Sequence, residues 1–454
     1  METMNKVTEV RDSYFVTYGV FYSMGVLTFV PYFFCILATD YWMFKFRDPS
    51  RGGPVQPDRP TPPPIPPDDF EDFAFLVDGA EDSGRARDRT QLQASFTSSF
   101  SITYQVSLLG FLVVTALFRK KLPPPSKRIK AALFSMLVLF LIHTAFTKIN
   151  TDSFQEAFFA IAMILAVLLN LSSAIIMVSL FELVINFPIG YYGTILSGQA
   201  ICGVVSAIVQ ICVQSIRLHY LTSALIYFMV GSVIILATTI FYLITKQKSK
   251  YFIYRIGQYE DTTQHPVDKK FSFNMDKLKG ALQSTKWFLG AMVFVQGSTA
   301  MVHPGLAALI VSVERDSGGG DQWNEIYFVP VVTFLGFHAC DLIGREVARK
   351  IQRPRNAFVI LALASLRLVL VPLLMLCNAQ PRRHMPVMFG DNQYMIFIYM
   401  FALSQGYLVN LCIISVPRVA KKEELEFVTV LLPLFSVLSV AICSTFNLVI
   451  ISLI

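Results

Sequence analysis

The 454-residue chain is 54% hydrophobic and only 15% charged, with a mean hydropathy of +0.54. A soluble domain carries about 25% charged residues, so this composition excludes an ordinary soluble protein and indicates one embedded in a membrane. The net charge of +7 is divided among separate loops. This distribution argues against the continuous basic patch expected of a nucleic-acid-binding protein.

The apolar residues form eleven blocks, several of them longer than the roughly 20 residues that a helix needs to cross the hydrocarbon core. Backbone groups in lipid must be hydrogen-bonded internally, so these blocks are predicted to be helices. The alternation over about ten residues that is typical of a β-barrel is absent. The predicted spans are 14–37, 95–118, 129–146, 158–183, 188–216, 221–244, 287–313, 326–348, 357–376, 394–416 and 427–454.

The distribution of Lys and Arg between loops predicts the orientation of these spans. Short cytoplasmic loops carry an excess of basic residues. One alternating set of loops is strongly basic, whereas the opposite set is poor in Lys and Arg wherever its loops are short. We therefore expect the N-terminus in the cytoplasm and, with an odd number of spans, the C-terminus outside. The basic set includes Arg119, Lys120, Lys121, Lys127, Arg128, Lys130, Lys246, Lys248, Lys250, Arg255, Arg349, Lys350, Arg353, Arg355, Arg418, Lys421 and Lys422.

Two long loops divide the chain. The first, residues 46–94, contains a proline-rich run and is expected to be a flexible extracellular segment. The second, residues 246–286, is a mixed-charge cytoplasmic loop. It separates a predicted six-helix bundle, residues 14–245, from a five-helix bundle, residues 287–454. The cytoplasmic N-terminus, residues 1–13, does not have the features of a cleavable signal.

No sequence motif of an enzyme is present, neither H-E-x-x-H nor G-x-S-x-G nor a P-loop. All seven cysteines lie in apolar blocks, so we expect buried small side chains rather than disulfides or metal ligands. No cofactor is expected. Eleven spans in a six-plus-five division, with polar residues at midplane depth, are typical of a transporter for a small polar solute.

Ionisable residues inside a membrane usually face a cavity or a partner. Asp341 and Arg345 lie four residues apart in the eighth span and therefore share a helical face. They are predicted either to line a polar path for a hydroxylated solute or to form a structural ion pair between helices, and spacing alone leaves the two readings even. Arg367 in the ninth span is expected to have a packing role, with Asp341 as a further possible partner.

Two histidines lie close to this carboxylate in the sequence. His303 precedes Pro304 in the seventh span, where a proline permits a helix break, and His338 lies one turn before Asp341. Together they suggest a proton relay. Neutral, hydrogen-bonding histidines are the more common finding in a helix bundle, and we favour that interpretation.

The most informative motifs lie in the fifth, eighth, ninth and tenth spans. The segments are Ser197-Gly198-Gln199 with Gly203, Tyr327-Phe328-Val329-Pro330, Asp341-Leu342-Ile343-Gly344-Arg345, Leu366-Arg367-Leu368-Val369-Leu370-Val371-Pro372, Leu376-Cys377-Asn378 and Gln405-Gly406-Tyr407-Leu408. They are similar to the S-G-Q-G-x-x-G, D-x-x-G-R and N-G-Y-L patterns and their flanking segments in one family. Over most of its length outside the two long loops, the chain resembles the equilibrative nucleoside transporters.

The resemblance implies facilitated, bidirectional diffusion of nucleosides by alternating access, in an all-α, major-facilitator-like fold of six plus five helices. It also implies that Asp341 and Arg345 contact the ribose. A carboxylate can accept hydrogen bonds from two vicinal hydroxyls, and a guanidinium can donate to ring or hydroxyl oxygens. The substrate-contacting set implied in this way is Asp341, Arg345, His338, Phe334, His303, Gln105, Leu108, Tyr32, Ile36 and Met177.

Several of these positions depart from the family pattern. Residues 31–33 are Pro-Tyr-Phe in place of P-W-N, and Met177 replaces a glutamine that reads the base. His303 replaces a phenylalanine, and His338 replaces an asparagine. Gln105, at a position that is usually apolar, is a candidate for the missing amide.

Three functions therefore follow as hypotheses. The first is an equilibrative nucleoside carrier that also accepts nucleobases. The second is a proton-linked nucleoside or organic-cation transporter of the same family, suggested by the two histidines. The third is a surface protein that binds nucleosides without transporting them. We expect a monomer in the plasma membrane, with nucleosides and the lipid bilayer as partners and no nucleic acid.

Overall fold

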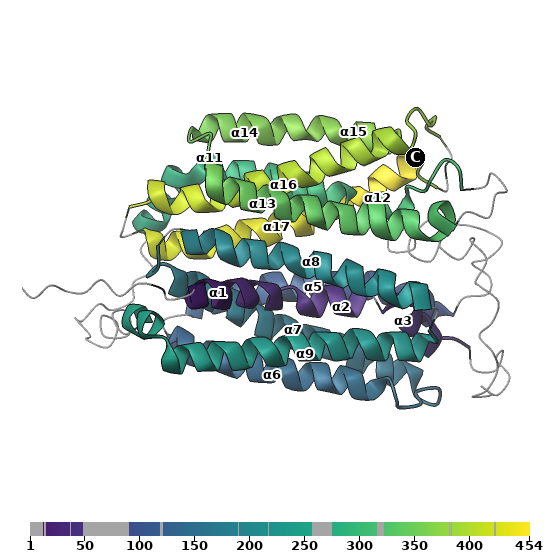
Figure 1. Ribbon diagram of the computed structural model, residues 1–454, viewed down its shortest axis with the longest axis horizontal. Coiled ribbons are helices and arrows are strands. Elements are labelled where there is room, and N and C mark those ends of the chain that lie inside the picture. Colours follow the sequence, from purple (N-terminus) through teal and green to yellow (C-terminus); the bar gives the residue numbers. More distant parts are fainter. Residues whose placement is uncertain are drawn as a thin grey trace, which may run out of the picture.

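The computed structural model describes most of the chain and is built of helices that run side by side (Figure 1). Within the described residues, extended pairing is limited to one antiparallel bridge between Ile310 and Ala379. The all-α prediction is thus confirmed. Most of the first long loop, residues 257–274 of the central loop and most of the N-terminal tail lie outside the described residues. The structure describes residues Asp12, 15–36, 38–48, 90–118, 121–188, 190–216, 218–256, 275–315, 322–380, Arg382, 384–421 and 424–454.

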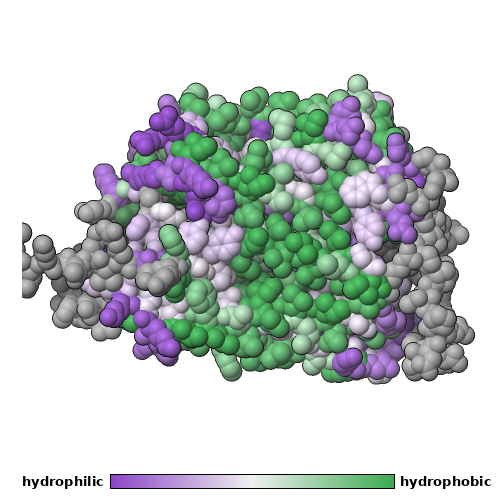
Figure 2. All heavy atoms as spheres, viewed as in Figure 1, coloured by the Kyte–Doolittle hydropathy of each residue, from purple (hydrophilic) through white to green (hydrophobic). Residues whose placement is uncertain are grey.

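Nine helices in the described part of the chain are long and apolar enough to cross a membrane. They correspond to the third to eleventh predicted spans. The first two predicted spans contain shorter apolar helical stretches, Val16–Leu27 and Ile102–Thr115, so the count of eleven stays a prediction. Figure 2 shows a hydrophobic band across the middle of the molecule and hydrophilic residues at both ends. This surface is that of a multi-pass membrane protein.

The helices α1 to α9 occupy one half of the molecule, and α11 to α17 occupy the other (Figure 1). In the first half the helices are α1 Val16–Leu27, α2 Val30–Ile36, α3 Thr39–Lys45, α5 Gln91–Phe118, α6 Pro125–Phe146, α7 Gln155–Val184, α8 Gly190–Ile216 and α9 Tyr220–Lys248. In the second half they are α11 Met275–Val302, α12 Gly305–Leu309, η4 Trp323–Tyr327, η5 Val329–Leu335, α13 Gly336–Ile351, α14 Ala357–Leu366, η6 Arg367–Val369, α15 Leu370–Met375, α16 Asp391–Val419 and α17 Leu425–Leu453.

The first predicted span is not one helix, and this prediction was wrong. Pro31 lacks the N–H that would bond to Leu27, and its ring would clash with that carbonyl, so α1 ends before it. The Thr28 hydroxyl donates to the Gly25 carbonyl at 2.8 Å and receives a hydrogen bond from the Gln199 amide of α8 at 3.1 Å. The break is therefore fixed to the neighbouring helix.

Helices of the second half are also interrupted. Pro304 ends α11 at Val302, and the described chain continues as the short helix α12. The eighth predicted span begins with two π-helical segments, η4 and η5, whose wider turns are frequent at functional sites. The central loop is shorter than predicted, because α11 begins at Met275 rather than near Trp287 and residues 250–256 are helical.

One end of the molecule, where α1 begins and α13 ends, is called here the basic end (Figure 1). Near it, Glu182 of α7 forms an ion pair with Arg128 of α6, and the two side chains are 15% and 4% exposed. Glu182 is thus paired inside the protein rather than extended to the membrane interface. Exposed basic residues at this end include Lys121, Lys127, Lys248, Lys350, Arg353, Arg355 and Arg418.

Candidate functional site

One face of η5 and α13 carries four of the predicted site residues. Phe334, His338, Asp341 and Arg345 follow one another at spacings of four, three and four residues, which places them on a single helical face. All four side chains are buried. The helix that carries them packs against α8 of the other half of the molecule. This face, called here the α13 face, therefore lies at the boundary between the two halves.

Asp341 and Arg345 form an ion pair within α13. The Arg345 Nε donates to Asp341 Oδ2 at 2.9 Å, and Arg345 Nη1 donates to the Leu196 carbonyl of α8, also at 2.9 Å. The second carboxylate oxygen, Asp341 Oδ1, is buried and has no hydrogen-bond partner among the described residues. Both members of the ion pair belong to α13, so the pair does not join two helices. The hydrogen bond from Arg345 to Leu196 does join α13 to α8. One carboxylate oxygen at the boundary therefore receives no hydrogen bond from the described residues.

The two histidines lie within a set of aromatic rings. His303 stacks on Phe337 with 3.9 Å between ring centroids and meets His338 edge-on at 5.3 Å. His338 also meets Phe33 of α2 edge-on at 5.2 Å. A Cβ added at Gly203 of α8 would lie 2.4 Å from His338 Nδ1, so the imidazole rests directly on a glycine. In the described residues neither histidine forms an ion pair with a carboxylate.

Three further predicted residues, Tyr32, Leu108 and Met177, form a group on the first half. Tyr32 and Met177 pack against a small buried cluster that contains Leu108 and Tyr104. The Tyr32 and Tyr104 ring centroids are 4.8 Å apart. Tyr32 also meets Phe33 at 5.6 Å, and through Phe33 this group is connected to His338.

Two predicted residues, Gln105 and Ile36, are not placed in either group. Gln105 lies on α5 and is half-buried. Ile36 is the last residue of α2, and its side chain lies outside the described part of the chain. Within the residues that the structure describes, no group of three or more His, Cys, Asp and Glu side chains could hold a metal ion.

A polar network in the second half was missed at the sequence level. The Gln405 amide donates to Gln296 at 2.7 Å, and Thr299 donates to Gln405 Oε1. Arg367 donates to Thr299 at 2.8 Å and to the Val295 carbonyl at 2.7 Å. Arg367 thus ties its segment to α11 rather than to Asp341. Two glutamines inside apolar spans were the signal that could have revealed the network.

A family model described as nucleoside transporter matches residues 163–451 of the chain. The chain belongs to the nucleoside transporter family. Among its relatives, human equilibrative nucleoside transporter 1 is 27% identical, with 96% of this chain and 97% of the relative covered. Human equilibrative nucleoside transporter 2 is 25% identical, with 95% and 96% covered. Rat equilibrative nucleoside transporter 3 is 26% identical, with 93% and 86% covered.

Membership of the nucleoside transporter family confirms the resemblance inferred from the motifs, and the family is one of transporters rather than enzymes. Among solved structures, the chain is similar to the major facilitator superfamily transporter FucP in the outward conformation. That likeness has a TM-score of 0.47 at 12% identity and covers 97% of this chain and 98% of the other.

Proposed function

We propose that this protein carries nucleosides across a membrane by facilitated diffusion, with the substrate held on the α13 face. One observation carries the proposal. Asp341 is buried at the boundary between the two halves, and its Oδ1 lacks a donor among the described residues. An unsatisfied buried acceptor costs about 1–3 kcal/mol, which a hydroxylated solute would relieve.

The chemistry of the face suits a ribose next to a base. Asp341 Oδ1 can accept from a sugar hydroxyl while Oδ2 stays bound to Arg345, which keeps the carboxylate in place. The rings of His303, His338 and Phe334 offer flat surfaces beside it. Aromatic faces stack on bases of every kind, so these rings are assigned to the base.

The two halves are proposed to move against each other about this face, in the manner of transporters that bind at the midplane. The proposed domains are the six-helix part, residues 14–245, and the five-helix part, residues 287–454. Basic loops support a cytoplasmic N-terminus and an extracellular C-terminus. A monomer in the plasma membrane remains our prediction. The match to nucleoside transporters supports nucleosides over the organic-cation alternative.

The test is uptake of labelled adenosine and uridine into proteoliposomes without an imposed ion gradient. We expect saturable flux in both directions. Unlabelled nucleosides should inhibit it by competition. Asp341→Asn should lower this flux by roughly 10- to 100-fold, since a hydrogen bond to a charged group contributes about 1.5–3 kcal/mol. The matched control is Asp152→Asn, which removes a carboxylate from a surface ion pair with Arg47.

Three results would count against the proposal. One is an absence of flux in protein whose thermal unfolding transition shows that it is folded. Another is nucleoside binding without flux, which would support a receptor on a transporter scaffold. A third is full flux by Asp341→Asn, which would place the substrate away from the α13 face.

A further inference from the structure

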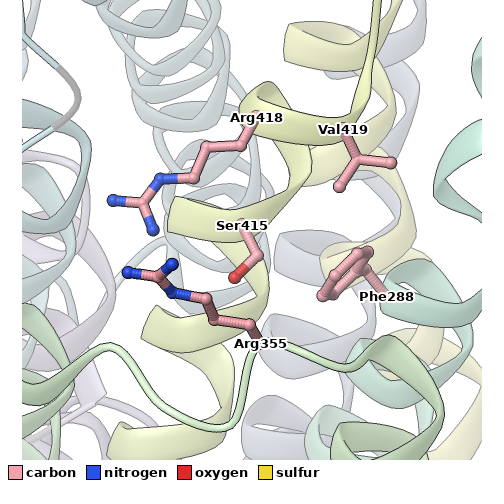
Figure 3. A pocket seen from close by; sticks show the side chains of 5 residues that line it. All are labelled: Phe288, Arg355, Ser415, Arg418 and Val419. Atoms are coloured by element: carbon pink, nitrogen blue, oxygen red, sulfur yellow. The ribbon is translucent and has the colours of Figure 1, made fainter.

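A pocket with two arginines in its lining lies at the basic end of the second half, away from the α13 face. Its volume is about 350 Å³, and it is lined by Phe288 of α11, Arg355 between α13 and α14, and Ser415, Arg418 and Val419 of α16 (Figure 3). Small-molecule sites span about 300–1,000 Å³, so this pocket is large enough for a compact polar ligand. None of the five residues belongs to the proposed nucleoside site.

Neither arginine of this pocket has an acidic partner in the part of the chain that the structure describes. Figure 3 shows both guanidinium groups pointing to the same side, with the Ser415 hydroxyl close to them. Arg418 donates to the side-chain oxygen of Gln352, and Arg355 forms no ion pair among the described residues. The buried carboxylate at this end, Glu424, accepts from Ser284 and from the Lys421 amide instead. The pocket therefore presents two guanidinium groups that no carboxylate of the described residues pairs with.

The donors suit a phosphate group. Guanidinium groups bind phosphate oxygens through two parallel hydrogen bonds, and they are favoured wherever such an anion is recognised. Two guanidinium groups on the same side of a pocket repel each other, and a bound anion would remove that repulsion. Ser415 adds a hydroxyl donor, and it makes no hydrogen bond of its own to the described residues.

The position of the pocket favours a lipid headgroup as the source of the phosphate. Trp287, adjacent to the pocket residue Phe288, is 47% exposed and meets the exposed ring of Phe358 edge-on. Lys286 lies over the Trp287 ring at 5.1 Å. Exposed tryptophans beside lysines are typical of the membrane–water interface, where basic pockets between helices bind anionic headgroups.

We propose that Arg355, Arg418 and Ser415 form a binding site for a phosphate ester, and that its source is the headgroup of an anionic phospholipid. The site is separate from the nucleoside path, and the proposal does not depend on which solute is transported.

The test is a titration of the full-length purified chain, followed by native mass spectrometry, with three probes. They are a short-chain phosphatidylinositol phosphate, phosphatidylcholine of the same chain length, and soluble inositol phosphate. The double variant Arg355→Gln/Arg418→Gln is compared with Lys350→Gln/Arg353→Gln, which removes two exposed charges from the same end but none from the pocket. Ser415→Ala serves as a milder variant that keeps both charges.

We expect the wild-type chain and the control to bind the anionic lipid alike, and phosphatidylcholine to bind weakly to every form. The double variant should bind the anionic lipid roughly 100-fold more weakly, because it loses a charge-assisted hydrogen bond from each arginine to the phosphate, and each such bond contributes roughly tenfold to the affinity. Ser415→Ala should lose roughly fivefold. Equal unfolding midpoints in phosphatidylcholine show that the variants are folded.

Two results would overturn either the phosphate site or the assignment of the phosphate to a lipid headgroup. The pocket is not a phosphate site if both the arginine double variant and Ser415→Ala bind the anionic lipid with wild-type affinity. The same conclusion follows if the control variant loses as much affinity as the arginine double variant. If soluble inositol phosphate binds as tightly as the lipid and loses the same affinity in the double variant, the phosphate chemistry stands. In that case the lipid source is wrong.

Discussion

Arg349 of α13 contacts Tyr18 of α1 in two ways. It donates a hydrogen bond to the Tyr18 hydroxyl, and its guanidinium carbon lies 4.9 Å from the centroid of the Tyr18 ring. The two residues belong to opposite halves of the molecule. The contact therefore joins the halves at the basic end, one turn beyond the bond between Arg345 and Leu196.

Removing this contact should loosen the basic end. Arg349→Gln loses both the charge-assisted hydrogen bond and the cation–π contact, worth about 1.5–3 kcal/mol together. We expect hydrogen–deuterium exchange to rise roughly tenfold or more in α1 and in the first turns of α8, as forms open at this end become more populated. Arg353→Gln is the control, because Arg353 is exposed at the same end. Unchanged exchange in α1 would mean that the contact does not hold the halves together.

Close packing of α13 on α16 predicts a strong effect at Gly406. A Cβ there would lie 1.9 Å from the Asp341 backbone oxygen, so the helices would have to separate. Gly406→Ala should destabilise the protein by about 1–3 kcal/mol or more, measured as a lower thermal unfolding midpoint. At Gly110 of α5 a Cβ meets nothing within 4 Å, so Gly110→Ala should be neutral or slightly stabilising. Equal midpoints for the two variants would contradict the observed packing.

The buried pair of Arg128 and Glu182 predicts a non-additive result. Glu182→Leu leaves the Arg128 guanidinium buried without this partner and should cost about 3–5 kcal/mol. The double variant Arg128→Leu/Glu182→Leu removes both charges and should be less destabilised than Glu182→Leu alone. Thermal unfolding of the single and double variants gives the coupling free energy. Additive losses would show that the ion pair is not energetically coupled.

His338 should influence which nucleoside is preferred. In the proposed site, His338→Asn shortens the side chain that rests on Gly203 and alters the donors offered to the base. We expect the ratio of inhibition constants for adenosine and uridine to change roughly fivefold, the effect of about one hydrogen bond. His219→Asn is the control, since the exposed His219 caps the start of α9 and asparagine also caps helices. An unchanged ratio would remove His338 from base recognition.

Much of the fold follows from local rules in the sequence. Long apolar blocks locate the membrane helices, and the four-residue spacing of Asp341 and Arg345 predicts the shared face and the pair that the structure contains. The junction between α7 and α8 was predicted correctly, because a single helix there would be too long for a bilayer.

Other features depend on tertiary contacts that no local pattern encodes. Arg367 could have turned toward Asp341, but hydroxyl and carbonyl groups of α11 and α16 receive its guanidinium instead. The π-helical turns before α13 were likewise not predicted from hydropathy, which does not distinguish a π-helix from an α-helix. The break between α1 and α2 could have been predicted from Pro31, because proline interrupts a helix, whereas hydropathy alone indicates one continuous span.

The fit of His338 against Gly203 has an evolutionary consequence. With 2.4 Å between a hypothetical Cβ at 203 and the imidazole, the two positions cannot vary independently. A larger residue at 203 is compatible only with a shorter side chain at 338. Among related sequences, substitutions at these two sites should therefore co-vary, and the glycine should be retained in every lineage that keeps histidine at 338.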